Sequence, residues 1–403
     1  MNHFSLSRRH LLGAAVCFSL VASLGLSACA QQGPTVSVSV ARVPDGGLQP
    51  QVVVAGAVVH LIYFKGDPKA GDVFYVRSAD SGTTWTAPLR VNSGAGSAVA
   101  MGTIRGPMLS VGRGGRAFVA WNGSDKAMPR NAAAPASVQK QGAAPLLFSR
   151  LNTAGDAFEP QRNLLTRTFN LDGGASVASD EEGRVYVAWH ANDREDQDET
   201  GRRVYLATST DDGTTFSPEK PVWNTPTGAC GCCRVGIKAG SGGRVSLLYR
   251  SATELIHRDS YFLQSADGGK SFRGQKINEW NINACPMSSF ALAGSEETSA
   301  IGWESAEKVY FSRLNDQGQA AQTVAAPGTG DNRKYPSLAL GSNGKLLFAW
   351  TEDTSWNRGG KLRFQLFDAN NQPVGATGEQ NGVPAWSFAT AFARPDGKLV
   401  VLY

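Results

Sequence analysis

Seven short runs of alternating apolar residues recur along the chain, and each run ends at an aromatic residue. Successive aromatic residues are separated by 47 to 68 positions, and they are Tyr63, Trp121, Trp189, Tyr249, Trp303, Trp350 and Tyr403. Each interval is long enough for one four-stranded sheet with its turns. Sheets repeated in this way bury their faces by stacking around an axis. The pattern therefore predicts an all-β protein, a β-propeller of seven four-stranded blades.

The composition and the segments just ahead of the runs agree with this fold. The chain has 46 glycines among 403 residues and no sustained 3.6-residue apolar periodicity, which disfavours helical and α/β folds. The innermost strand of each blade is expected to start just before its aromatic run. The seven predicted starts are Gln49, Arg105, Asp172, Cys232, Cys285, Lys334 and Trp386.

The two ends of the repeat region are predicted to close the ring together. The seventh run stops at Tyr403 before it could supply outer strands, and residues 35–43 alternate as a strand does. Pairing this strand with the last blade would remove an open sheet edge. The propeller is thus predicted to span residues 35–403, and six blades with one decorating repeat is the alternative.

Residues 1–28 have the features of an export signal. Arg8 and Arg9 precede an uncharged apolar run that reaches Leu26, which resembles a twin-arginine signal. The sequence that follows resembles a lipobox, in which Cys29 becomes acylated and residues 29–34 form a tether. The alternative is a plain cleaved signal. We expect an extracytoplasmic protein, lipid-anchored to a bacterial membrane on its periplasmic side or at the cell surface.

The charge balance argues against a nucleic-acid partner. Once residues 1–28 are removed, 37 basic and 34 acidic residues remain, a surplus of only +3. The chain also has no stripe of basic and aromatic residues that would suit a single strand.

Three octapeptides of the form S-x-D-x-G-x-[TS]-[WF] mark turns between strands. The aspartate can accept hydrogen bonds from the turn backbone, the glycine can adopt a positive φ, and the aromatic ring can pack beneath. These structural residues are Asp80, Gly82 and Trp85, then Asp211, Gly213 and Phe216, then Asp267, Gly269 and Phe272.

These boxes, at this spacing, resemble the Asp-box propellers of the sialidase superfamily. The resemblance implies a propeller, and it leaves the activity open because such propellers include exo-sialidases, related glycoside hydrolases and binding proteins without catalysis. A sialidase would need arginines that clamp a carboxylate, an aspartic acid, and a tyrosine with a glutamate as nucleophile. The candidates for these roles are Arg105, Arg234, Arg250, Asp172, Tyr335 and Glu304. None of them matches the family's local motifs, and family sialidases have six blades.

Polar side chains are expected to gather on one face of the ring. The starts of inner strands and the loops after the aromatic runs share that face, and Lys65, His190 and Lys334 belong to it. Two loops there are enlarged, 123–144 and 190–203, where specificity normally resides. The leading hypothesis is therefore a propeller that binds a polar, glycan-like ligand or a protein partner on this face.

The four cysteines outside the first 29 residues are the chain's most unusual feature. They are Cys230, Cys232, Cys233 and Cys285, and the last lies about one blade after the others. We expect them to converge near the central tunnel. In an oxidising compartment we expect disulfides; three pairings are possible, and the preferred one has a bridge between the fourth and fifth blades and another within the segment 230–233. If they are reduced, they could bind Cu or Zn, since soft sulfur ligands favour these metals, or act as reactive thiols. No cofactor is required by the sequence.

Overall fold

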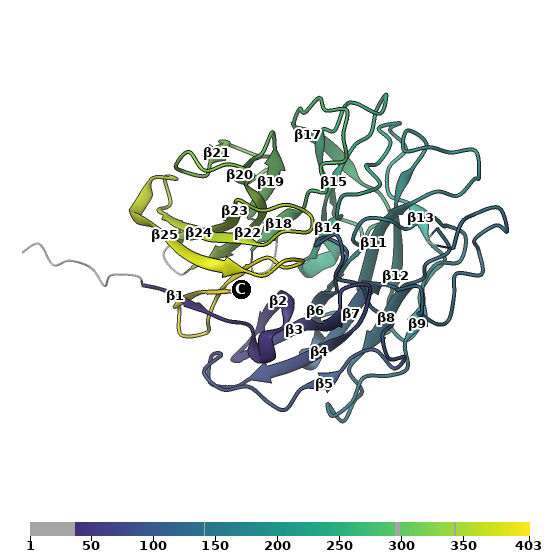
Figure 1. The fold of residues 1–403 in the computed structure, drawn as a ribbon, viewed down its shortest axis with the longest axis horizontal. Coiled ribbons are helices and arrows are strands. Elements are labelled where there is room, and N and C mark those ends of the chain that lie inside the picture. Colours follow the sequence, from purple (N-terminus) through teal and green to yellow (C-terminus); the bar gives the residue numbers. More distant parts are fainter. Residues whose placement is uncertain (1–36, 141, 295–298, 342–343) are drawn as a thin grey trace, which may run out of the picture. The chain divides into compact units, whose positions relative to one another are not determined.

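Seven β-sheets follow one another around a common axis in the computed structural model, which confirms the predicted propeller (Figure 1). The structure describes residues 37–140, 142–294, 299–341 and 344–403, and Ser37–Tyr403 form one compact unit. The predicted export signal, Cys29 and the tether lie outside the described residues. Among the described residues, no helix is long and apolar enough to cross a bilayer.

Six sheets have four antiparallel strands each, and the chain runs from the innermost strand outward. The first sheet contains β2 (Leu48–Ala55), β3 (Val58–Asp67), β4 (Ala70–Ser78) and β5 (Leu89–Arg90). The second contains β6 (Met108–Gly112), β7 (Arg116–Asn122), β8 (Leu146–Arg150) and β9 (Arg162–Asn163). The third contains β10 (Ser176–Ser179), β11 (Val185–Ala191), β12 (Arg203–Ser209) and β13 (Lys220–Pro221). The next three are β14 (Gly236–Ala239), β15 (Val245–Arg250), β16 (Ser260–Ser265) and β17 (Arg273–Asn278); β18 (Phe290–Ala293), β19 (Ala300–Ser305), β20 (Lys308–Arg313) and β21 (Val324–Ala325); and β22 (Lys334–Leu340), β23 (Leu346–Glu352), β24 (Gly360–Phe367) and β25 (Pro373–Val383). Short 3-10 turns are η1 (Pro44–Gly46), η2 (Arg113–Gly115) and η3 (Ser241–Gly243).

The seventh blade joins the two ends of the described chain, as predicted. It contains β26 (Thr390–Ala393), β27 (Leu399–Leu402) and β1 (Val38–Ala41), and β1 pairs in parallel with β27. The amide of Val43 donates to the carbonyl of Tyr403 at 3.1 Å, which extends this pairing beyond the strand. Within the described residues this blade has three strands and not the predicted four, because β1 alone covers the outer edge of β27.

The core lies between neighbouring blades. The aromatic residues at the ends of the second strands are buried, and Trp121, Trp189, Trp303 and Trp350 are each at most 1% exposed. A typical apolar cluster contains side chains from two adjacent sheets, such as Tyr75 of β4 with Trp121 of β7. Burial of a large aromatic side chain stabilises a fold by about 1.5–3 kcal/mol. The aromatic repeat in the sequence is therefore the repeat of the blade interfaces.

The three Asp-box turns have the predicted hydrogen bonds. Asp267 accepts from the amides of Lys270 and Ser271 at 2.9 and 3.0 Å and from the Ser271 hydroxyl at 2.6 Å. These hydrogen bonds hold the pKa of Asp267 well below its usual range, and the bond from the Ser271 hydroxyl has the largest effect. Asp80 and Asp211 make equivalent contacts. The box glycines have φ values of 85°, 71° and 75° at Gly82, Gly213 and Gly269. The boxes therefore shape turns between the third and fourth strands.

Several inner strands begin later than predicted. Asp172, Cys232, Cys285 and Trp386 all lie in loops before their strands. Left-handed backbone at Met287 and Trp386, with φ of 47° and 64°, interrupts the extended conformation there. These loops approach the axis ahead of the sheet and form the face described below.

Candidate functional site

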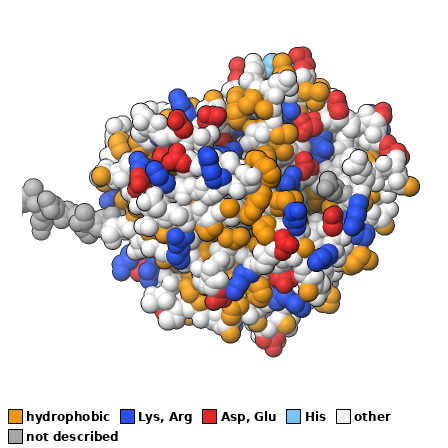
Figure 2. Space-filling model, viewed as in Figure 1, with side chains coloured by type: hydrophobic (Ala, Val, Ile, Leu, Met, Phe, Trp, Pro, Cys, Tyr) orange, Lys and Arg blue, Asp and Glu red, His pale blue; other side chains and the backbone are white. Residues whose placement is uncertain are grey.

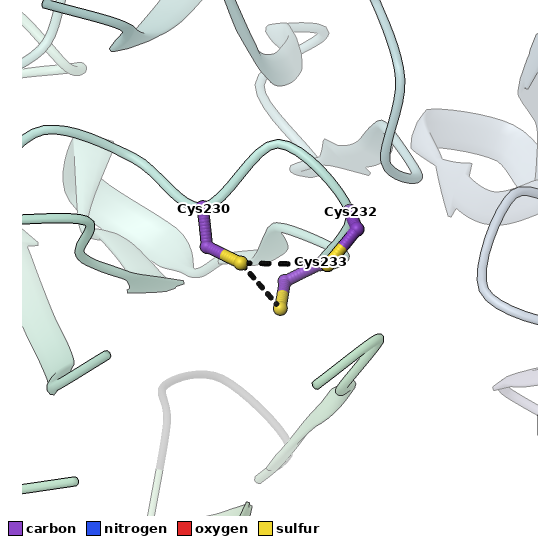
Figure 3. Close-up of side chains that lie close together, drawn as sticks. All are labelled: Cys230, Cys232 and Cys233. Atoms are coloured by element: carbon purple, nitrogen blue, oxygen red, sulfur yellow. Dashed lines mark hydrogen bonds between the residues drawn. The ribbon is translucent and has the colours of Figure 1, made fainter. Parts of the chain in front are cut away.

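Three cysteine side chains meet in the loop before β14, on the face of the ring that carries the starts of the inner strands (Figure 3). We call it the cysteine-bearing face. The Cys230 sulfur is 3.6 Å from that of Cys232 and 3.1 Å from that of Cys233. All three residues are at most 4% exposed. These distances exceed the S–S bond length of about 2.05 Å, and the three residues are free thiols.

The backbone of this loop is fixed from both sides. The Cys230 amide donates to the Arg250 carbonyl at 2.9 Å, and the Gly231 amide donates to the Glu199 carboxylate at 2.5 Å. A Cβ atom at Gly231 would lie 2.6 Å from that same carboxylate oxygen, so only glycine fits there. Glu199 in turn pairs with Arg258 at 2.7 Å. The sulfur positions are thus set by a rigid support.

Cys233 is the thiol with the strongest polar support. The Ser288 hydroxyl and amide donate to its sulfur at 3.2 and 3.4 Å. Burial raises the pKa of Cys233, but hydrogen bonds from Cys230 and Cys232 and the charge of Arg250 outweigh it and lower that pKa below its usual range. Because Ser288 precedes β18, this contact joins the fourth and fifth blades.

Cys285 is placed less centrally than expected. It is exposed, and it lies outside the group of three whose sulfurs are all within 4.8 Å of one another. Its thiol interacts with that of Cys232, and this hydrogen bond lowers the pKa of Cys285 to about 7. All four described cysteines are free, so the structure lacks the predicted disulfides.

Two of the predicted catalytic residues bind each other. A terminal guanidinium nitrogen of Arg105 contacts the Asp172 carboxylate, and the Arg105 Nε donates to the Asp172 carbonyl at 2.8 Å. Both side chains are partly exposed, at 24% and 46%. The pair ties the two side chains to each other, and the roles of both residues stay predictions.

The other two predicted arginines are buried and serve the protein interior. Arg250 is 1% exposed and donates to the Ser288 hydroxyl, the Arg258 carbonyl and the Glu304 carbonyl. Arg234 is 5% exposed and donates to the Ile104 carbonyl across the ring at 2.9 Å. All three guanidinium nitrogens of Arg250 are therefore engaged within the protein, whereas one terminal nitrogen of Arg234 has no hydrogen-bond partner within the described part of the chain.

Tyr335 and Glu304 are neighbours, but not through the tyrosine hydroxyl. The Glu304 carboxylate accepts from the backbone amide of Tyr335 at 2.9 Å and pairs with Lys334 at 3.0 Å. Burial lowers the pKa of Lys334, but the Glu304 charge outweighs this and raises it. The Tyr335 ring lies in an apolar cluster with Ile104 and Phe388. Tyr335, Phe388 and Arg234 line a cavity of about 180 Å³, and the Arg234 guanidinium lies over the Phe388 ring.

The remaining predicted ligand contacts are scattered. Lys65 is exposed on the first blade, where β3 pairs with β4. His190 is 2% exposed, and its Nε2 lies 2.7 Å from the Cys233 carbonyl. Burial, aided by the charge of Arg202, lowers the pKa of His190, so the neutral ring donates to that carbonyl. His190 therefore positions the cysteine loop. Of the three predicted ligand contacts, His190 and Lys334 lie near this loop, and Lys65 does not.

A polar pocket that the sequence did not reveal lies beside the cysteine loop. It is about 330 Å³ in volume and is lined by the enlarged loop 190–203 and by the segment that leads into Cys230. Its lining includes Asp193, Arg194, Arg202, Arg203 and Trp223. We call it the Trp223 pocket. The length of loop 190–203 was its only sequence signal.

Charged side chains of both signs are interspersed over the face shown in Figure 2, and hydrophobic side chains gather near its middle. This mixture agrees with the small net charge of the chain. A surface of this kind has no extended field of one sign. Recognition must therefore depend on local pockets.

No family model and no curated protein sequence match the chain. Among solved structures it is similar to a protein of unknown function from Dyadobacter fermentans, with 15% identity, a TM-score of 0.52, and coverage of 82% of this chain and 96% of that one. It is also similar to a Penicillium chrysogenum α-L-arabinanase, with 14% identity, a TM-score of 0.46 and coverage of 82% and 95%. A Trypanosoma rangeli sialidase has 15% identity, a TM-score of 0.49 and coverage of 81% and 54%, so the chain spans about half its length. These similarities concern the fold alone, which is a β-propeller.

Proposed function

We propose that this protein is a membrane-tethered, extracytoplasmic propeller that binds an anionic, glycan-like ligand in the Trp223 pocket. The observation that carries the proposal is the lining of this pocket, which includes three arginines, one aspartate and an indole ring. Its volume of about 330 Å³ lies within the range of small-molecule sites.

The chemistry of the lining suits an acidic sugar. Arg194, Arg202 and Arg203 against Asp193 give the pocket a surplus of positive charge. Guanidinium groups bind carboxylates through parallel hydrogen bonds. The Nε of Arg202 is buried and has no hydrogen-bond partner within the described part of the chain.

The aromatic side of the pocket would provide the apolar contact. Trp223 is half-buried and packs against Tyr261, with ring centroids 5.6 Å apart. An indole ring supplies a large contact area at low entropic cost. A sugar ring that packs against Trp223 could direct its polar groups toward the arginines. In ligand pockets, apolar and aromatic side chains typically provide the contact area, and a few polar groups fix the orientation of the ligand.

Calorimetric titration with sialyllactose and with an oligogalacturonate tests this function. We expect binding of one or both, weaker at high salt, and no binding of neutral lactose. Arg203→Gln should weaken binding about 10-fold or more, since a charge-assisted hydrogen bond contributes about 1.5–3 kcal/mol. Arg90→Gln, on the outer strand of the first blade, is the matched control. Equal binding by both variants would contradict the site.

Hydrolysis is the outcome that would replace this proposal. Turnover of a fluorogenic sialoside that is lost in Tyr335→Phe would assign the alternative function, an exo-sialidase. Turnover that survives in this variant would point to a contaminating enzyme.

The membrane tether rests on the sequence of residues 1–29. If Cys29 is acylated, the protein should incorporate labelled palmitate and fractionate with membranes. Cys29→Ser should release it into the soluble fraction without changing ligand binding. A protein that remains soluble before this substitution would support the plain cleaved signal.

A further inference from the structure

The cysteine loop presents three sulfur atoms at the spacing of a metal site. The sulfurs of Cys230, Cys232 and Cys233 all lie within 4.8 Å of one another, and two of their separations are 3.1 and 3.6 Å. A metal–sulfur bond of about 2.3 Å requires sulfurs about 3.8–4.0 Å apart. Only small side-chain rotations separate the observed arrangement from a coordinating one (Figure 3).

The surroundings can neutralise a thiolate complex. Arg202 and Arg258 interact electrostatically with Cys230 and Cys232, and Arg250 does so with Cys233. Three thiolates around a monovalent ion carry a charge of −2. Three guanidinium groups together with Glu199 supply +2, which removes most of the cost of burying that complex.

The coordination number favours a monovalent soft ion over zinc. Structural zinc sites have four closed ligands in a tetrahedron, but the group found among the described residues contains three cysteines. The side chain that packs against the three cysteines is Met287, whose thioether is also a soft ligand. Thiolate and thioether ligands suit Cu(I), zinc and iron–sulfur clusters, and of these we favour Cu(I) because three grouped thiolates fall short of a closed set of four.

An exposed thiol stands next to this group. Cys285 is exposed and interacts with Cys232, while Cys232 itself is 4% exposed. An ion arriving from solvent can therefore bind Cys285 before it reaches the buried sulfurs. Ser288, which donates to Cys233, and Glu199, which fixes the loop, complete the support that metal ligands normally have.

We propose that Cys230, Cys232 and Cys233 bind one Cu(I) ion, with Met287 beside it and Cys285 as the thiol through which the ion enters. Its sulfur ligands do not line the Trp223 pocket, although both sites lie on the cysteine-bearing face and Arg202 borders both. Substitutions of the cysteines should therefore affect copper binding, and substitution of Arg203 should affect sugar binding.

The test is anaerobic competition between the processed protein and a colorimetric Cu(I) chelator, combined with alkylation and mass spectrometry of each cysteine. We expect alkylation of all four cysteines in the metal-free protein, one Cu(I) per chain, and protection of Cys230, Cys232 and Cys233 when copper is bound. Mutation of a residue that only supports the metal ligands typically lowers metal affinity 10–100-fold. Cys233 is itself a proposed ligand, so Cys233→Ser should lower the affinity for Cu(I) by at least about 100-fold.

Matched variants separate the ligands from general damage. Met287→Leu should weaken Cu(I) binding several-fold, whereas Met128→Leu, at an exposed position in another loop, should not. Cys285→Ser should slow copper uptake more than it lowers affinity. Arg203→Gln should leave copper binding unchanged.

Three results would overturn the assignment. Disulfides among Cys230, Cys232 and Cys233 in the folded protein would leave no thiolate ligands. Tighter binding of Zn(II) than of Cu(I) would assign a different metal. Copper binding that survives Cys233→Ser in a variant with unchanged thermal stability would place the ion elsewhere.

Discussion

Glu219 is the buried carboxylate whose removal should be most damaging outside the two sites. It is 3% exposed and lies just before β13 of the third blade. Its oxygens accept the amides of Thr166, Arg167 and Thr168 at 3.0, 2.7 and 3.0 Å, and the hydroxyls of both threonines. This one side chain therefore fixes the connection from the second blade to the third, which continues to Asp172.

The cost of Glu219→Ala follows from these contacts. Three amides and two hydroxyls lose their acceptor, and each buried unsatisfied group costs about 1–3 kcal/mol, partly offset by water that enters the space. We expect a net loss of about 3–5 kcal/mol. With an unfolding entropy of about 2.1 cal/mol/K per residue over Ser37–Tyr403, the melting temperature should fall by about 4–6 °C.

Scanning calorimetry at pH 7 measures this difference, with Glu181→Ala at an exposed position as the control. Burial raises the pKa of Glu219, but hydrogen bonds from Thr166 and from the Arg167 amide outweigh it and lower that pKa below 4.5. As the pH falls, Glu219 is protonated in the unfolded state before it is protonated in the folded state. Its contribution to the stability of the folded state is therefore present above pH 4.5 and is lost as the pH falls through the pKa of the folded state. Melting within 1 °C of the unchanged protein at pH 7 would refute the reasoning.

Three further predictions use the same logic. Burial, and to a lesser extent the charge of Arg77, lowers the pKa of His60 from 6.5 to about 4. Between these two pH values the unfolded state binds more protons than the folded state. The free energy of unfolding should therefore fall by about 3 kcal/mol as the pH drops from 6.5 to 4. Denaturant titrations should show this slope and lose it in His60→Gln. In the third Asp-box, Asp267→Ala should speed amide hydrogen exchange at Lys270 and Ser271 and leave distant strands unchanged. Arg250→Met leaves the carbonyls of Arg258 and Glu304 without this donor, and its urea midpoint should correspond to a loss of about 2–4 kcal/mol.

The fold could be predicted because its determinants repeat. Trp121, Trp189, Trp303 and Trp350 occupy the same position in four of the blades, and each is buried there. The Asp-boxes are local in the same sense, since each aspartate bonds to residues three and four positions later. Ring closure by β1 also follows from a local cause, the unpaired edge of β27.

The site could be predicted only in part, because its geometry depends on contacts between loops. The spacing of Cys233 and Cys285 correctly indicated that the fourth and fifth blades meet at the cysteines, but it could not reveal that Cys285 turns outward. Ser288 and Met287 were missed since neither residue type is informative alone. Trp223 was missed because its pocket partners lie 20 to 30 residues earlier in the chain.

Arg250 shows why residue type alone misassigns roles on this face. In the sequence it follows an aromatic run, where a guanidinium could reach a substrate. In the structure it lies beneath the cysteine loop, accepts the Cys230 amide through its carbonyl, and directs its three donors to Ser288, Arg258 and Glu304. The positive charge of Arg250 also lowers the pKa of the Cys233 thiol. An arginine committed to a protein interior in this way supports buried thiolates better than it binds a soluble carboxylate. On this face Arg250 and Arg258 serve the cysteine loop, Arg194 and Arg203 line the Trp223 pocket, and Arg202 borders both.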